Sequence, residues 1–271
     1  MKSKWLSGPY VIWMVLFTLI PLGIVFYFAF TDGAGQFTLA NIQRLGAYLP
    51  ILLRSAWMSI FSSILCLLIG YPVAYCMSKA SPTRQKIYYM LIMLPMCLSF
   101  LLRTMAWVSL LEDTGIINNV LRSLGLSPLP LIRNTGAVIL GMVYNYLPFM
   151  IMPLYTVLIK IDHRLIEAAQ DLGCNQVQVF TKVILPLSVP GIVSGITMVF
   201  VPAVSTFYIS QKLGSPGAVL IGDVIESQFK GAYNPNLGAA MSLILMALIF
   251  LCVGLMNHFS GTDDEEGVAT L

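Results

Sequence analysis

Six apolar stretches occupy about half of this chain, and each is close to the length that an α-helix needs to cross a bilayer. They cover residues 10–30, 57–77, 87–111, 136–159, 191–209 and 237–256. Because about 20 mostly apolar residues span the hydrocarbon core, the pattern predicts six transmembrane helices. The polar stretches between them are too short for a separate soluble domain, so we expect one membrane domain over residues 1–260.

Charged residues are scarce, which separates this chain from soluble proteins. They make up 10% of its 271 residues, against about 25% in ordinary soluble domains. An all-α membrane protein is therefore the expected fold class. The first stretch follows Lys2 and Lys4 as a secretory signal would, but it is longer than the apolar region of such a signal, and we expect a retained helix. The basic residues are scattered rather than striped, which argues against a nucleic-acid partner.

Basic residues between the stretches indicate the orientation in the membrane. Eight Lys and Arg residues lie on the side of the two termini and six on the other side. The loop 78–86 is more informative, because it holds three basic residues and no acid, and basic residues in short loops mark the cytoplasmic side. We therefore expect both termini in the cytoplasm, with residues 261–271 as an acidic, solvated tail.

Arg103 is the single charged side chain within the six predicted helices. Carriers driven by protons or sodium usually keep acidic or histidine side chains at membrane depth, so the energy for transport is expected to come from outside this chain. Two interpretations of Arg103 remain. It extends toward the outer surface or pairs with an acid, or it lines a substrate path.

Polar and aromatic side chains gather in the third, fourth and fifth stretches. Aromatic rings are common anchors at membrane interfaces, so interface anchoring and a solute path are both open. The candidate path residues are Trp107, Glu112, Asp113, Tyr144, Tyr146 and Tyr208. The cysteine and histidine residues have no metal-binding spacing, and we expect no metal site.

The segment 161–186, between the fourth and fifth stretches, carries clear signals of a short helix. Asp162 is a favourable N-cap, and Gly173 suits the left-handed position that ends a helix. Ile161, before the cap, is expected to pack on Ile166. These signals predict a helix of about three turns.

A second helix is expected directly after the first, with Asn175 as its N-cap, Gln178 completing a capping box and Pro186 at its end. The first helix has two faces. The face expected to pack on its own bundle holds Leu165, Ala169 and Leu172. The face expected to meet a partner holds Arg164, Glu167 and Asp171.

The same segment contains a motif of acidic, small and apolar residues at fixed spacing. It consists of Glu167, Ala168, Ala169, Gly173, Leu185 and Pro186. This motif resembles the EAA loop of permeases from binding-protein-dependent ABC importers, with Val183 where the pattern usually has isoleucine. The resemblance implies that the first four motif residues form a coupling helix that docks on an ATPase.

Further segments extend the resemblance to most of the chain. Residues 146–155, 165–173, 186–192, 207–210 and 219–229 resemble the spermidine/putrescine permeases of these importers. The resemblance implies a six-helix ABC importer permease in the inner membrane of a bacterium, surrounded by lipid. It also implies a second homologous permease, two copies of a cytoplasmic ATPase and an extracytoplasmic binding protein that delivers the polyamine.

ATP and magnesium would then be bound by the ATPase, because this chain has no phosphate-binding G-x-x-x-x-G-K-[ST] motif. We therefore expect no cofactor in this chain and no enzymatic activity. Three alternatives remain: a permease of the same family for another solute, a secondary carrier or channel that works alone, and an intramembrane enzyme. The last is disfavoured because His163 and His258 lie far apart in the sequence.

Overall fold

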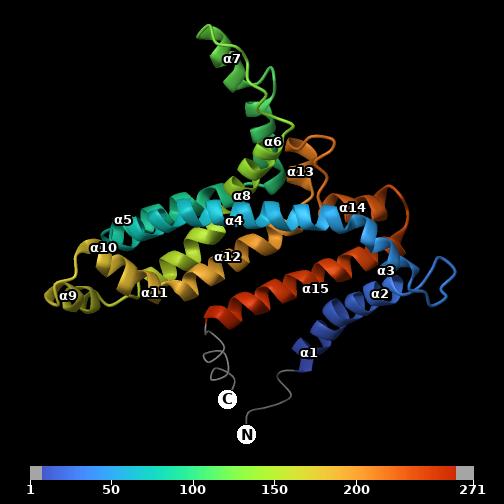
Figure 1. Cartoon of the computed structure of the whole chain (residues 1–271), viewed down its shortest axis with the longest axis horizontal. Coiled ribbons are helices and arrows are strands. Elements are labelled where there is room, and N and C mark those ends of the chain that lie inside the picture. Colours follow the sequence, from blue (N-terminus) through green and yellow to red (C-terminus); the bar gives the residue numbers. More distant parts are fainter. Residues whose placement is uncertain (1–7, 261–271) are drawn as a thin grey trace.

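The computed structural model describes residues 8–260, and the regular structure within that range is helical apart from one isolated bridge, Thr31 to Phe37. Lys2, Lys4 and the acidic tail predicted at residues 261–271 lie outside the described residues. The prediction of an all-α fold is confirmed. The chain forms a bundle from which one pair of helices projects (Figure 1).

The helices are α1 (Gly8–Met14), α2 (Ile20–Ala29), α3 (Ala40–Arg44), α4 (Leu49–Ser78), α5 (Pro82–Met93), α6 (Phe100–Leu111), α7 (Ile116–Ser123), α8 (Thr135–Leu158), α9 (His163–Asp171), α10 (Gln176–Val179), α11 (Leu185–Leu187), α12 (Val189–Val204), α13 (Tyr208–Leu213), α14 (Ile221–Lys230) and α15 (Pro235–Ser260). Two π-helical segments, Val15–Leu19 and Phe180–Ile184, and two 3-10 segments, Leu45–Tyr48 and Leu94–Cys97, connect some of them.

Four helical runs in the described part of the chain are long and apolar enough to cross a membrane by themselves. They are Val11–Ala29, Ala40–Ser78, Thr135–Leu158 and Pro235–His258. Two further candidates are bent pairs of helices, and counting each pair as one span gives six. One pair, Pro82–Cys97 and Phe100–Ser123, is bent by 87°, and the other, Gln176–Leu187 and Val189–Val204, by 61°.

The third predicted span, residues 87–111, therefore contains a sharp break, which its apolar composition did not predict. Leu98 and Ser99 have extended backbone, with ψ of 147° and 135°. Pro95, three residues earlier, cannot donate a helical hydrogen bond, and the chain around it forms a 3-10 segment. The residues after the break form α6 and α7, which project from the bundle (Figure 1).

Prolines elsewhere are accommodated in different ways. Pro72 lies inside α4 and Pro148 inside α8, and both helices continue through them. Pro21 and Pro186 each follow a π-helical segment by two residues. A proline lacks the N–H for a regular helical hydrogen bond. In both places the helix widens to a π turn just before the proline, and it continues beyond the proline.

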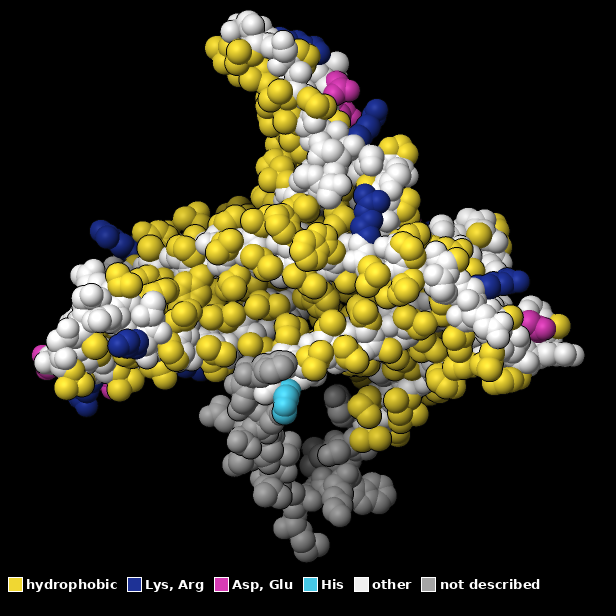
Figure 2. Space-filling view, viewed as in Figure 1, with side chains coloured by type: hydrophobic (Ala, Val, Ile, Leu, Met, Phe, Trp, Pro, Cys, Tyr) yellow, Lys and Arg dark blue, Asp and Glu magenta, His cyan; other side chains and the backbone are white. Residues whose placement is uncertain are grey.

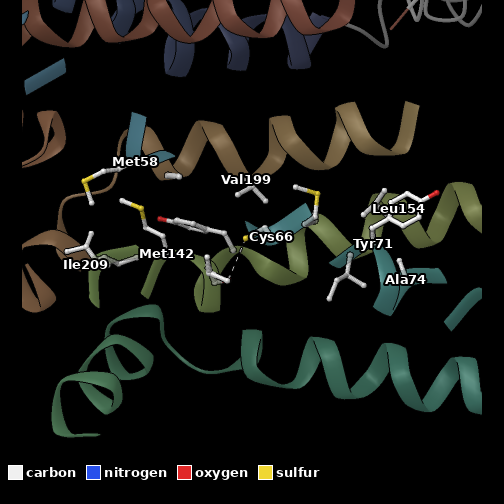
Figure 3. Packing of buried hydrophobic residues seen from close by; sticks show 14 of the residues in the cluster. Met58, Cys66, Tyr71, Ala74, Met142, Leu154, Val199 and Ile209 are labelled. Carbon is white, nitrogen blue, oxygen red and sulfur yellow. Dashed lines mark hydrogen bonds between the residues drawn. The ribbon is translucent and has the colours of Figure 1, made fainter. Parts of the chain in front are cut away.

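Three long helices, α4, α8 and α12, form the centre of the bundle. Their buried side chains meet in one apolar cluster, to which Cys66 of α4, Met142 of α8 and Val199 of α12 belong (Figure 3). Small residues at the crossing let the backbones approach closely, as is typical of membrane helices. A Cβ on Gly70 would lie 3.1 Å from Met150 Cγ, and a Cβ on Gly195 would lie 2.7 Å from Met150 Sδ.

The first and last long helices, α2 and α15, lie side by side at the edge of the bundle (Figure 1). Ala29 of α2 packs in a small cluster with Ala239 and Ala240 of α15. At the end of this pair, Asn236 Nδ2 donates to the carbonyl oxygen of Thr31 at 2.8 Å, and Asn41 Nδ2 donates to the same oxygen at 2.9 Å. The two amides fix the turn that follows α2.

Apolar side chains cover most of the visible bundle surface, and charged ones gather at its ends and on the projecting arm (Figure 2). This distribution is expected for a protein whose middle contacts lipid. The arm, α6 and α7, also carries apolar residues that the chain leaves exposed, among them Ile116, Val120 and Leu124. Asn118 holds the arm's tip together, because its Nδ2 donates to the carbonyls of Glu112 and Leu129.

Candidate functional site

Helix α9 begins at the position that the sequence predicted. Asp162 is the N-cap, and its Oδ1 accepts a hydrogen bond from the N–H of Arg164 at 3.0 Å. Ile161 and Ile166 are both partly buried against the main apolar cluster. The cap prediction is therefore confirmed, and the start of α9 is fixed both by a hydrogen bond and by apolar packing.

The end of α9 depends on Gly173. This residue has φ of +85°, a left-handed conformation that glycine adopts without steric cost. Its N–H donates to the carbonyl of Gln170 at 2.8 Å, and the N–H of Cys174 donates to that of Ala169 at 3.0 Å. These two bonds form a Schellman motif, which ends α9 sharply and turns the chain toward α10.

The capping box predicted for the second helix is also confirmed. The N–H of Gln178 donates to Asn175 Oδ1, and the N–H of Asn175 donates to Gln178 Oε1, each at 2.9 Å. Helix α10 then passes into the π-helical segment Phe180–Ile184 and reaches Pro186. The segment 161–186 therefore begins with two short helices joined by a tight turn. We call it the coupling loop, after the role that its sequence motif predicts.

The prediction of which face of α9 packs inward was only partly right. Ala169 is buried, as expected, but its inward neighbour is Ile166, whereas Leu165 is 48% and Leu172 is 86% exposed. Leu172 is the C-cap residue of α9, and the apolar periodicity did not reveal that its side chain is exposed. The exposed side of α9 thus presents leucine side chains beside Ala168, next to the charged residues.

Glu167 lies on the exposed side of α9, where its Oε1 is 3.3 Å from Nδ1 of His163 one turn earlier. Both side chains are largely solvent-exposed. At the base of the loop, Ala169, Val179 and Ile184 are buried in the same apolar cluster as the central helices. The coupling loop is therefore anchored in the bundle by its apolar side and open to a partner on its polar side.

The candidate path residues do not all lie together. Trp107 of α6 and Tyr144 of α8 are in contact, with ring centroids 5.3 Å apart and an interplanar angle of 70°. Tyr208 of α13 lies next to Phe100 of α6, with centroids 6.1 Å apart. Tyr146 is buried, and its hydroxyl donates to the carbonyl of Pro202 at 3.3 Å. Trp107, Tyr144 and Tyr208 therefore line the seam where α6 meets α8 and α13, whereas the hydroxyl of Tyr146 bonds to α12.

Glu112 and Asp113 lie away from this seam, at the junction of α6 and α7 on the projecting arm. Both side chains are exposed, and neither takes part in an ion pair between described residues. Arg122 donates to the backbone carbonyl of Asp113 rather than to its carboxylate. The two carboxylates are thus accessible to a ligand or partner, and no hydrogen bond or ion pair between described residues links them to the aromatic seam.

Arg103 points into the protein rather than outward. Its Nε and Nη1 atoms are buried and have no hydrogen-bond partner among the described residues. Neither described ion pair involves it. Burying a charged group without a hydrogen-bond partner is costly, so the placement of Arg103 agrees better with a role inside the protein than with extension to the outer surface.

An acidic pair that is absent from the predicted path residues lies on α14. Asp223 Oδ2 accepts from the N–H of Leu220 at 2.8 Å, and burial raises the pKa of the Asp223 carboxyl. Glu226 accepts hydrogen bonds from Lys230 and Gln211, which lower the pKa of the Glu226 carboxyl. Asp223 lines a cavity of about 450 Å³ with Arg133, Gln211 and Lys212. Sequence spacing gave no sign that the loop after α13 would fold this pair back onto Gln211.

A family model described as "Binding-protein-dependent transport system inner membrane component" matches residues 66–261. This match covers more than half of the chain, and the chain belongs to this family. It is a multi-pass inner-membrane component of a transport system. This class agrees with the apolar bundle and with the anchored loop described above.

Among proteins of known function, the spermidine/putrescine transport system permease protein PotB of Haemophilus influenzae is 39% identical over 250 residues, with 88% of this chain and 87% of PotB covered. PotB of Escherichia coli is 36% identical over 252 residues, with 88% and 92% covered. A solved bacterial ABC transporter for the import of the acidic polysaccharide alginate has the same fold, with a TM-score of 0.77, 20% identity and 96% and 95% of the two chains covered.

Proposed function

We propose that this chain is the permease of an ATP-driven, binding-protein-dependent importer that moves spermidine or putrescine into the cytoplasm. The observation that carries the proposal is the 39% identity to a spermidine/putrescine permease over 88% of this chain. The coupling loop supports it, because it offers a docking surface for a separate ATPase. A chain with one charged residue in its six predicted spans and no phosphate-binding motif is expected to take its energy from such a partner. Both termini and the coupling loop face the cytoplasm in this proposal.

The coupling loop would receive the motion of a separate ATPase. Glu167 and Ala168 are exposed on α9, and Gly173 fixes the direction in which the helix ends. Ala169 supports this surface from beneath, since its side chain is buried against the bundle. Two ATPase copies would serve this chain and a homologous second permease, and those copies would bind ATP and magnesium.

The aromatic seam between α6, α8 and α13 would guide the polyamine. Ammonium groups bind the faces of aromatic rings, and Trp107 and Tyr144 offer such faces. The ring of Tyr208 already has Lys212 Nζ 5.8 Å from its centroid, and the polyamine would have to displace that ammonium. Glu112 and Asp113 would add negative charge from the arm. Arg103, beside the seam, opposes a cationic substrate, so the second permease is expected to contribute further carboxylates.

Uptake of labelled spermidine by the reconstituted complex tests this proposal. The complex of both permeases and the ATPase, placed in proteoliposomes with the binding protein, should import spermidine only when ATP is present. Uptake of another solute in preference to spermidine and putrescine would identify a different substrate. Uptake that persists without the ATPase would instead favour a carrier that works alone.

Replacing Trp107 with leucine should lower spermidine uptake about three- to thirtyfold, the range expected for the loss of a cation–π contact. Trp57→Leu is the matched control, because Trp57 lies on the bundle surface with 68% of its area exposed. Uptake rates at several spermidine concentrations would measure both. An equal effect of the two variants would contradict a path at the seam.

A Glu112→Gln, Asp113→Asn double variant tests the two acids separately, and it should weaken spermidine uptake. Unchanged uptake kinetics in this variant would remove both acids from the path.

A further inference from the structure

The coupling loop joins α12 at Ser188, where the two helical segments meet at 61°. Pro186 and Pro190 flank this residue, and neither can donate a helical hydrogen bond. Ser188 is fully buried, and its hydroxyl donates to the carbonyl oxygen of Leu185 at 2.8 Å. Two helical segments thus meet at a buried polar residue between two prolines.

A tyrosine of α4 reaches this bend. The hydroxyl oxygens of Tyr71 and Ser188 are 2.9 Å apart, and both side chains are buried. Because the single hydroxyl proton of Ser188 is committed to Leu185, Tyr71 is the donor of this bond. A chain of two hydrogen bonds therefore runs from α4 through the bend to the backbone of the coupling loop.

Aromatic packing brings the same two elements together about two helical turns before the bend. The ring of Phe180 makes edge contacts with Tyr71 and Tyr75, with centroids 5.6 and 5.8 Å away. Tyr71 and Tyr75 are one helical turn apart on α4, so Phe180 contacts both rings from the coupling loop. The hydroxyl of Tyr75, unlike that of Tyr71, makes no hydrogen bond between described residues.

Beyond the bend, α12 is packed mainly against α8. A Cβ on Gly191 would lie 3.1 Å from Val157 Cβ and 3.2 Å from the carbonyl oxygen of Pro153. Gly70, the residue before Tyr71, makes the close crossing of α4 with Met150 of α8. The Tyr71 hydroxyl therefore attaches the loop to α4 right beside the point where α4 crosses the next central helix.

We propose that Tyr71 and Ser188 form a joint through which the coupling loop moves the central helices. Tyr71 acts as a positioning residue, since it contacts the loop and not the substrate. A displacement of α9 by the ATPase passes along the loop to Ser188 and, through the hydrogen bond, to α4 and α8. The role in import rests on the proposed function, whereas the attachment of the loop to α4 does not.

Tyr71→Phe tests the joint, because it removes the hydroxyl and keeps the ring against Phe180. In the assembled complex without ATP, hydrogen exchange of the amides of residues 180–189 should rise about fivefold, the change expected for one ordinary hydrogen bond. Spermidine imported per ATP hydrolysed should fall by a similar factor, with ATP hydrolysis retained. Ser188→Ala should have the same effects, and the double variant should be no worse than either single one.

Tyr75→Phe is the matched control, since it removes a neighbouring hydroxyl that makes no hydrogen bond in the described structure. Exchange and import ratio should stay at their original values. Unchanged exchange in Tyr71→Phe, an equal rise in Tyr75→Phe, or additive effects in the double variant would overturn the proposed joint.

If Tyr71→Phe does not assemble, the Ser188→Ala variant is judged by the same criteria. A complex that imports no spermidine would contradict the proposed substrate, and the exchange measurements would still decide on the joint.

Discussion

Gly173→Val is expected to lower coupled spermidine uptake about tenfold or more, while the subunit still inserts and assembles. Gly173 has φ of +85°, and a Cβ added there would meet nothing within 4 Å. The change therefore acts through backbone strain alone, which costs about 1–2 kcal/mol for an ordinary residue in this conformation and more for a branched one. Relief of that strain would open the Schellman turn and redirect the end of α9. Spermidine imported per ATP hydrolysed measures the effect.

Gly125→Val provides the control for this prediction. Gly125 follows α7 on the projecting arm, has φ of +75°, and also has open space around an added Cβ. The same strain is thus introduced at a site remote from the coupling loop, and uptake per ATP should be retained. An equal loss in both variants would mean that Gly173 has no special role in coupling.

Gly222→Ala is expected to destabilise the end of the bundle formed by α13 and α14 by about 1–3 kcal/mol, the usual cost of overpacking. A Cβ on Gly222 would lie 2.5 Å from the carbonyl oxygen of Thr206 and 2.6 Å from that of Ser205. Both obstacles are backbone atoms, so no side chain can rotate away. The loss should appear as a lower unfolding temperature of the detergent-purified complex.

Gly217→Ala is the companion variant, in the loop that precedes α14. An added Cβ there would meet nothing within 4 Å, and the carbonyl that accepts from Arg54 is kept. Its unfolding temperature should match that of the unmodified complex. Should both alanine variants unfold at the original temperature, the close approach of α14 to Ser205 and Thr206 would not contribute to stability.

The local signals of the sequence predicted the coupling loop well. Helix caps and stops depend on residues within a few positions of each other, so local spacing was enough to place Asp162, Gly173 and the Asn175–Gln178 box. The face of α9 that packs inward could not be predicted in this way, because it depends on how the loop turns against distant helices. Leu172 fits the apolar periodicity of α9, yet it is exposed.

The side of the protein that carries the arm, α13 and α14 was harder to predict, since its arrangement is set by contacts between distant segments. Composition marked residues 87–111 as one apolar stretch, but the extended Leu98 and Ser99 turn its second half out of line. Glu112 and Asp113 follow that turn onto the arm, away from the tyrosines with which they were grouped. The loop after α13 folds back and places Asp223 at its cavity. The path of such a loop cannot be predicted from the periodicity of apolar residues.

The pairing of α2 with α15 has a consequence for the order in which this chain is built. Nearly all of the side chains in Val11–Ala29 are exposed, and the helix packs mainly on a partner that starts at Pro235. At about 5–20 residues per second of synthesis, the first helix waits roughly 10 to 40 s in the bilayer before that partner emerges from the ribosome. A truncation that removes the last helix would thus leave the first one without the helix on which it packs.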